Sequence, residues 1–267
     1  MELFLLKDGN PNATEPAHGT YITFESHGSR LFGRLLLPDF FDKESRCPVV
    51  LMLHGHPGGD KNLDIGEALR ANGFAVAVFS YRGVWGSHGD YLLSHNIEDV
   101  AACVAFLREK AENYRLDPET VFLFGHSMGG FSALNAVARG LKVSGAVLMA
   151  PYDAGFMYLH NRPNFDSVMA CKNTGYFRLS HENALEEDAA ANAEDWAFDD
   201  LLPKLDKNIP YCFIDGTKDT TSLHMGPVAE KMKQAGFRVA YHLLEDGHMF
   251  PLHRATIARI ALEQFGK

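Results

Sequence analysis

Residues 122–140 read FLFGHSMGGFSALNAVARG, and this stretch decides the fold. Its first residues are apolar, the Gly-His-Ser-Met-Gly pentapeptide at 125–129 follows, and a helical pattern then runs to Gly140. When a strand turns this tightly into a helix, the flanking positions approach neighbouring backbone so closely that a Cβ would clash. The pattern G-x-S-x-G between a strand and a helix therefore predicts that Ser127 is a nucleophile lifted clear of a sheet.

The rest of the chain alternates between strand and helix patterns. Near-continuous apolar runs, typical of strands buried on both faces of a parallel sheet, lie at 48–54, 74–80, 121–125, 145–150, 211–216 and 239–244. Residues 20–26 alternate at period two, residues 30–38 follow a His-Gly-Ser turn, and together they predict an antiparallel hairpin at the sheet edge. We therefore expect an α/β fold with a mostly parallel, twisted sheet of about eight strands and helices on both faces.

Two helical segments lead to more specific predictions. The apolar stripe at 97–108 predicts a helix with Asn96 as its N-cap. Residues 151–203 contain no clear strand but hold eight aromatic residues, which favours a helical insertion that covers the site as a lid. A plain surface hairpin with its own small core is the alternative. The 267 residues otherwise fit a single domain, 1–267, with this insertion inside it.

Composition narrows the classes of partner and compartment. The formal net charge is −9 without a basic stripe, which argues against nucleic acid. No apolar run approaches the ~20 residues that cross a bilayer, and the N-terminal run 3–6 is too short for a signal peptide. The four cysteines are scattered and are expected to be reduced. We expect a cytoplasmic protein without a membrane partner, and the sequence does not indicate an oligomeric state.

A nucleophilic serine needs a base and an acid that orients the base. His248 stands after the apolar run 239–244, at the end of a predicted strand where ligands of open α/β sheets bind. Two carboxylates are candidates for the acid: Asp215 ends the preceding strand, and Asp219 lies four residues later. Asp219 is favoured because its loop can lean toward His248. The order Ser127, Asp219, His248 is the one expected of this fold.

The loop after the first central strand, LMLHGHPGGDKN at 51–62, is expected to supply part of an oxyanion hole. The backbone N–H groups of His56 and Met128 are the candidate donors. A metal site built from His54, His56 and Asp60 is the alternative, but no further ligand appears at a regular spacing. We expect neither a metal nor another cofactor.

With these residues the chain resembles an α/β-hydrolase from about residue 20 onward. The branch it most resembles contains prolyl-oligopeptidase-like domains, dienelactone-hydrolase-like proteins and bacterial acyl (cinnamoyl-type) esterases. The motifs behind this resemblance are HGHPGG (54–59), YRGVWGSHGD (81–90), GHSMGG (125–130), GTKDTTS (216–222) and DGHMF (246–250). Dienelactone hydrolases use cysteine where this chain has Ser127, and the chain has no room for the propeller domain of prolyl oligopeptidases.

The resemblance and the residues together predict a serine hydrolase that cleaves small-molecule esters of small to medium apolar or aryl acids. The insertion aromatics Phe156, Trp196 and Phe198 are the expected substrate contacts. One alternative is a small peptidase or amidase, in which acids at 186–188 hold a substrate amine. The other is a binding module without catalysis, which would have no use for the three catalytic residue types in this order.

Overall fold

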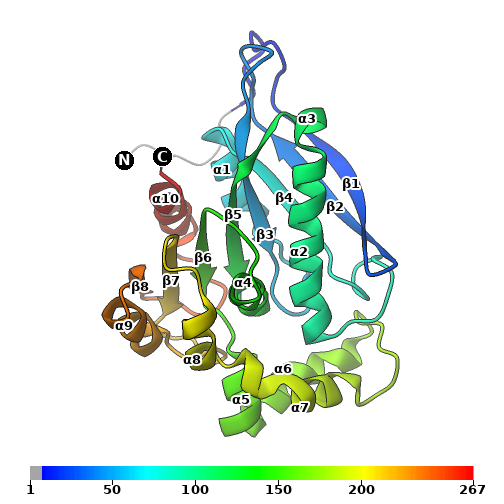
Figure 1. Ribbon diagram of the computed structural model, residues 1–267, viewed down its shortest axis with the longest axis vertical. Helices are drawn as coiled ribbons and strands as arrows, with labels where there is room; N and C mark the ends of the chain where they lie inside the picture. The colour runs from blue at the N-terminus through cyan, green and yellow to red at the C-terminus, as the bar shows by residue number, and fades with distance from the viewer. Residues whose placement is uncertain (1–7, 267) are drawn as a thin grey trace.

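The computed structural model describes residues 8–266, and the N-terminal run 3–6 lies outside the described residues. Its centre is one eight-stranded sheet with the order β1-β2-β4-β3-β5-β6-β7-β8. β1 and β2 form an antiparallel hairpin at one edge, β2 pairs antiparallel with β4, and the remaining neighbours are parallel. The predicted edge hairpin and the mostly parallel sheet are therefore confirmed (Figure 1).

The strands are β1 (His18–Ser26), β2 (Ser29–Leu37), β3 (Cys47–Leu53), β4 (Ala75–Phe79), β5 (Leu116–His126), β6 (Gly145–Met149), β7 (Pro210–Gly216) and β8 (Arg238–Leu244). The α-helices are α1 (Leu63–Ala71), α2 (Leu93–Glu109), α3 (Ala111–Tyr114), α4 (Met128–Ala138), α5 (Ala154–His160), α6 (Arg162–Met169), α7 (Ala184–Trp196), α8 (Phe198–Leu201), α9 (Gly226–Gln234) and α10 (Arg254–Gln264). Two short 3₁₀ helices are η1 (Ala170–Thr174) and η2 (Leu202–Lys204).

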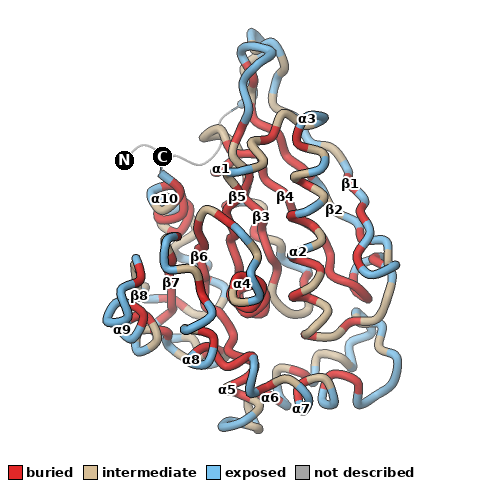
Figure 2. The backbone as a smooth tube through the Cα atoms, viewed as in Figure 1, coloured by how far each residue is buried: buried red, intermediate tan, exposed pale blue. Residues whose placement is uncertain are grey.

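The apolar strand runs are buried because helices cover both faces of the sheet. Successive side chains of a strand point to opposite faces. In β3, Val49 and Leu51 belong to the core under α2 and α4, whereas Val50 and Met52 belong to the core under α1 and α10. Figure 2 shows that the buried residues follow the strands and the inner sides of these helices.

The segment between β6 and β7 is helical, as predicted for residues 151–203. It contains α5, α6, α7 and α8, and these helices gather beyond the ends of the strands at the bottom of Figure 1. Only one isolated bridge, between Val84 and Phe177, gives it any extended pairing within residues 8–266. The insertion therefore lies at the carboxyl ends of the parallel strands, where β5 ends and α4 begins.

Within residues 8–266, no helix is both long and apolar enough to span a bilayer.

The prediction that Asn96 caps a helix is wrong. α2 begins a turn earlier, at Leu93, and Asn96 lies inside it, fully buried. Its side-chain amide donates a hydrogen bond of 2.8 Å to the Tyr91 hydroxyl. A side-chain hydrogen bond to a residue five positions earlier, rather than a helix end, therefore accounts for this polar residue.

Candidate active site

Ser127 occupies the turn between β5 and α4. Its backbone has φ 54° and ψ −118°, outside the regions that non-glycine residues ordinarily adopt. Two backbone hydrogen bonds hold this conformation: the Ser127 N–H donates to the Met149 carbonyl at 2.9 Å, and the Tyr152 N–H donates to the Ser127 carbonyl at 3.0 Å. Such strain persists where the surroundings over-determine the backbone, and it is common at functional sites.

The glycines around Ser127 are required by close backbone approach. A Cβ on Gly125 would lie 2.5 Å from the Gly129 carbonyl oxygen. A Cβ on Gly129 would lie 2.0 Å from the Leu53 carbonyl oxygen. No side chain fits at either distance, so the motif's spacing has the physical cause that the sequence suggested.

His248 and Asp219 lie in the loops that follow β8 and β7, and they are hydrogen-bonded to each other. His248 Nδ1 lies 2.8 Å from Asp219 Oδ2. The other Asp219 oxygen accepts the backbone N–H groups of Thr221 and Ser222 at 2.7 and 3.2 Å. Burial by itself raises the pKa of Asp219, but the hydrogen bond and charge of His248 and these two N–H donors together lower it below its ordinary value. Asp219 is therefore held as a carboxylate facing the imidazole.

Asp215, the alternative acid, has a different partner. Its side chain is buried and accepts the backbone N–H of Met225, the residue just before α9. Burial raises the pKa of Asp215 to about 6. Asp215 thus stabilises the start of α9, and the structure brings Asp219 rather than Asp215 to His248.

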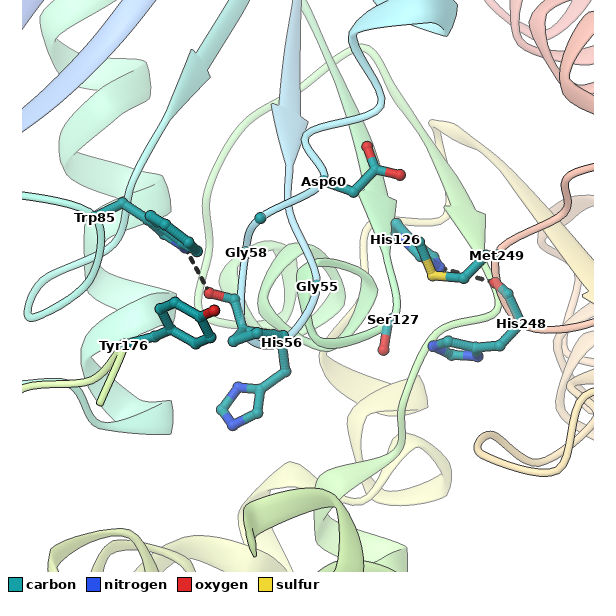
Figure 3. Close-up of a pocket in the computed structure, with 12 residues that line it drawn as sticks. Gly55, His56, Gly58, Asp60, Trp85, His126, Ser127, Tyr176, His248 and Met249 are labelled. Carbon is teal, nitrogen blue, oxygen red and sulfur yellow. Dashed lines mark hydrogen bonds between the residues drawn. The ribbon is translucent and has the colours of Figure 1, made fainter. Parts of the chain in front are cut away.

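A cavity of about 280 Å³ lies beside Ser127 and includes His56 and His248 in its lining. Figure 3 shows Ser127 between the His56 loop and the His248 ring. Within residues 8–266, no acceptor is hydrogen-bonded to the backbone N–H of His56 or to that of Met128, the first residue of α4. Free N–H groups in a strand-to-helix elbow and a neighbouring loop are what an oxyanion hole requires.

His126 is a site residue that the sequence analysis did not single out. Its Nε2 lies 3.0 Å from the backbone carbonyl of His248, and since a carbonyl only accepts, Nε2 carries the proton. The two imidazole rings lie 5.0 Å apart. Burial lowers the pKa of His126 to about 3, so its ring is uncharged. His126 therefore anchors the loop that carries His248, a role that only the three-dimensional contact reveals.

The three residues of the alternative metal site do not converge. His56 Nδ1 is hydrogen-bonded to the Tyr91 hydroxyl at 2.8 Å, and the ring of His54 packs 4.5 Å from that of Tyr81. The His56 ring and the Asp60 carboxylate point away from each other in Figure 3. Across the described part of the chain, no three His, Cys, Asp or Glu side chains are grouped to hold a metal ion.

The aromatic residues that the sequence suggested as substrate contacts do not line this cavity. Trp196 and Phe198 are fully buried, and Trp196 packs edge-on against Phe131 of α4. Phe156 packs against His160 within α5. Trp196 and Phe198 belong to the core cluster that contains Phe131, and so they attach the insertion to the helical layer of α4. Trp85 and Tyr176 line the cavity instead.

Comparison with known proteins shows that the chain belongs to the alpha/beta hydrolase family, whose model matches residues 50–260. Liver carboxylesterase B-1 of Rattus norvegicus is 33% identical over 138 residues, which are 45% of this chain and 24% of that protein. Lysophosphatidylserine lipase ABHD12 of Danio rerio is 30% identical over 116 residues, 41% of this chain and 29% of its own length. The chain thus spans only about a quarter of the length of these relatives.

Solved structures share the fold at low sequence identity. A Pyrococcus horikoshii acylaminoacyl peptidase superposes with a TM-score of 0.71 at 16% identity, over 97% of this chain and 42% of that one. A fungal esterase from Rhizomucor miehei gives a TM-score of 0.71 at 17% identity, over 94% and 83% of the two chains. Esterase and peptidase relatives fit the α/β-hydrolase resemblance, and at these identities they establish the architecture alone.

Proposed function

We propose that this protein is a serine esterase that cleaves esters of small to medium apolar or aryl carboxylic acids. The observation that supports it most is the hydrogen bond of 2.8 Å between His248 and Asp219 at the cavity that Ser127 lines. A strained serine, an oriented imidazole and a buried carboxylate in one site are the requirements of nucleophilic acyl transfer.

In the proposed cycle, Ser127 Oγ attacks the acyl carbon while His248 Nε2 removes its proton. Asp219, at Nδ1, keeps the imidazole in the required tautomer and stabilises its charged form. The N–H groups of His56 and Met128 bind the negative oxygen of the tetrahedral intermediate. His248 then returns the proton to the leaving alcohol, and water releases the acid from the acyl-enzyme by the same steps.

The cavity supports a small substrate. Its volume of about 280 Å³ is near the lower end of the ~300–1,000 Å³ found for small-molecule sites. Pro57, Trp85, Tyr176 and Met249 provide apolar lining, which suits an uncharged acyl group.

All four cysteines are free. Free thiols are usual in reducing compartments, and this supports our proposal that the protein acts in the cytoplasm.

The peptidase alternative needs a carboxylate that could hold a substrate amine, and the acids at 186–188 were its candidates. None of them lines the cavity. Each has a partner in the protein: Arg162 for Glu186, His181 for Glu187, and the Ser94 N–H for Asp188. The ester proposal therefore has more support than the amide one.

A panel of p-nitrophenyl esters and aminoacyl p-nitroanilides on the purified protein tests the proposal. We expect kcat/KM to be higher for the esters by several orders of magnitude, and Ser127→Ala to abolish turnover of every ester. Faster cleavage of an aminoacyl anilide would replace the esterase proposal with the peptidase one.

A further inference from the structure

One wall of the cavity consists of two stacked aromatic rings that come from distant segments. Trp85, in the loop after β4, and Tyr176, in the insertion, have ring centroids 4.9 Å apart and planes inclined by 25°. Both line the cavity, yet their exposed fractions are 43% and 48%. Each ring therefore has one face in the stack and apolar surface left for another group.

The protein holds Trp85 in a specific position. Its backbone is left-handed, with φ 47°, which is uncommon for a bulky residue. The indole N–H donates to the Pro57 carbonyl at 2.7 Å, and so ties the ring to the loop that carries His56. A backbone strained to keep a large ring at the mouth of a site indicates that this ring has a task there.

The two segments behind the rings are joined by backbone hydrogen bonds. The Arg178 N–H donates to the Gly83 carbonyl at 2.7 Å, and the Tyr91 N–H donates to the Arg178 carbonyl at 2.8 Å. A Cβ on Gly83 would lie 2.8 Å from the Arg178 carbonyl oxygen, so the two segments meet without space for a side chain. The aromatic wall is therefore a fixed surface rather than a loose pair of loops.

The position of the wall decides which half of an ester it meets. His248 must give its proton to the leaving alcohol, so the alcohol lies on the His248 side of Ser127. In Figure 3, Trp85 and Tyr176 lie on the opposite side, with Ser127 and the His56 loop between them and His248. The wall therefore meets the acyl half.

We infer that Trp85 and Tyr176 determine acyl specificity by binding an aromatic ring of the acyl group. The preferred substrates are then esters of arylalkanoic or arylalkenoic acids with small alcohols. This inference rests on the proposed esterase function. Aromatic rings favour stacked or edge-to-face partners over alkyl chains of similar size, which gives two exposed rings a natural aryl ligand.

The test compares methyl 3-phenylpropanoate with methyl butanoate, which share the leaving group and differ in the terminal ring. For the wild type we expect kcat/KM to favour the aryl ester at least tenfold, because each buried CH₂-sized group adds about fourfold. We expect Tyr176→Leu and Trp85→Asn each to lower this preference about two- to tenfold. Asparagine is chosen at position 85 because it tolerates the left-handed backbone there. The control Phe41→Ala removes an exposed ring away from the cavity and should leave the preference unchanged.

The wild-type measurements separate the two levels of the argument. If the wild type hydrolyses neither ester, the proposed function fails, and the inference with it. If it hydrolyses methyl butanoate at least as fast as the aryl ester, the inference alone is overturned. Variants that lose both esters equally would also overturn it, since the rings would then support only the shape of the site.

Discussion

Asp219→Asn is the change that most sharply separates the two candidate acids. In the native site, one Asp219 oxygen accepts the Thr221 and Ser222 N–H groups, and the other accepts from His248. An asparagine has one oxygen and one amide nitrogen. The two backbone N–H donors require the oxygen, so the amide nitrogen must face His248 and donate to Nδ1.

That arrangement forces the proton of His248 onto Nε2, the atom that should accept the proton of Ser127. The imidazole is then in the wrong tautomer, although its position is unchanged. A loss of about 10⁴-fold in kcat is the magnitude known for this defect in a serine triad. Asp215→Asn is the matched control, because its carboxylate contacts Met225 rather than His248 and an amide oxygen can still accept that N–H.

The assay is kcat/KM for p-nitrophenyl acetate at neutral pH, with thermal melting of each variant to establish that it is folded. We expect Asp219→Asn to lose about four orders of magnitude and Asp215→Asn to stay within about tenfold of the wild type. Losses of equal size would contradict the assignment of Asp219. A greater loss for Asp215→Asn would transfer the role to that residue.

Three further predictions concern stability and metals. His126 is buried with a pKa of about 3, against ~6.5 in an unfolded chain, so below pH 6.5 unfolding takes up a proton and the folded protein loses stability. Replacing it, His126→Gln, should make the unfolding free energy less dependent on pH between pH 6 and 4, by about 1.4 kcal/mol per pH unit in urea titrations. An unchanged pH dependence would contradict an uncharged, buried ring. Trp196→Ala should destabilise by about 3–5 kcal/mol and weaken turnover of all esters alike, whereas a change in acyl preference would return Trp196 to the substrate site. Dialysis against EDTA should leave ester hydrolysis unchanged, and activity that returns only with zinc would support the metal alternative.

The strained turn at Ser127 could be predicted from sequence because its cause is local. Gly125 and Gly129 are needed where backbones approach, and the apolar run before them and the helical pattern after them give the context. The central parallel strands could be predicted equally well, since burial on both faces requires near-continuous apolar residues. Asp219 and His248 are paired because both lie in loops at the carboxyl ends of neighbouring parallel strands.

What sequence reasoning missed depends on how side chains pack in three dimensions. Asn96 has the chemistry of an N-cap, but its partner is the Tyr91 hydroxyl inside the core. Trp196 and Tyr176 are both aromatic residues of the insertion, yet one is buried and the other borders the cavity. Composition does not distinguish them, because the side of the insertion that faces α4 is set by the packed fold. Trp85, 91 positions from Tyr176, becomes its neighbour only in three dimensions.

Covalent labelling by a fluorophosphonate tests the central proposal most directly, because this probe reacts with an activated serine and leaves a stable adduct. The protein is incubated with the probe, assayed for ester hydrolysis, digested, and searched by mass spectrometry for the modified peptide. The account predicts one adduct, on Ser127, whose formation parallels the loss of activity, and no adduct on the folded Ser127→Ala variant. An adduct on another residue, or full ester hydrolysis by Ser127→Ala, would contradict it.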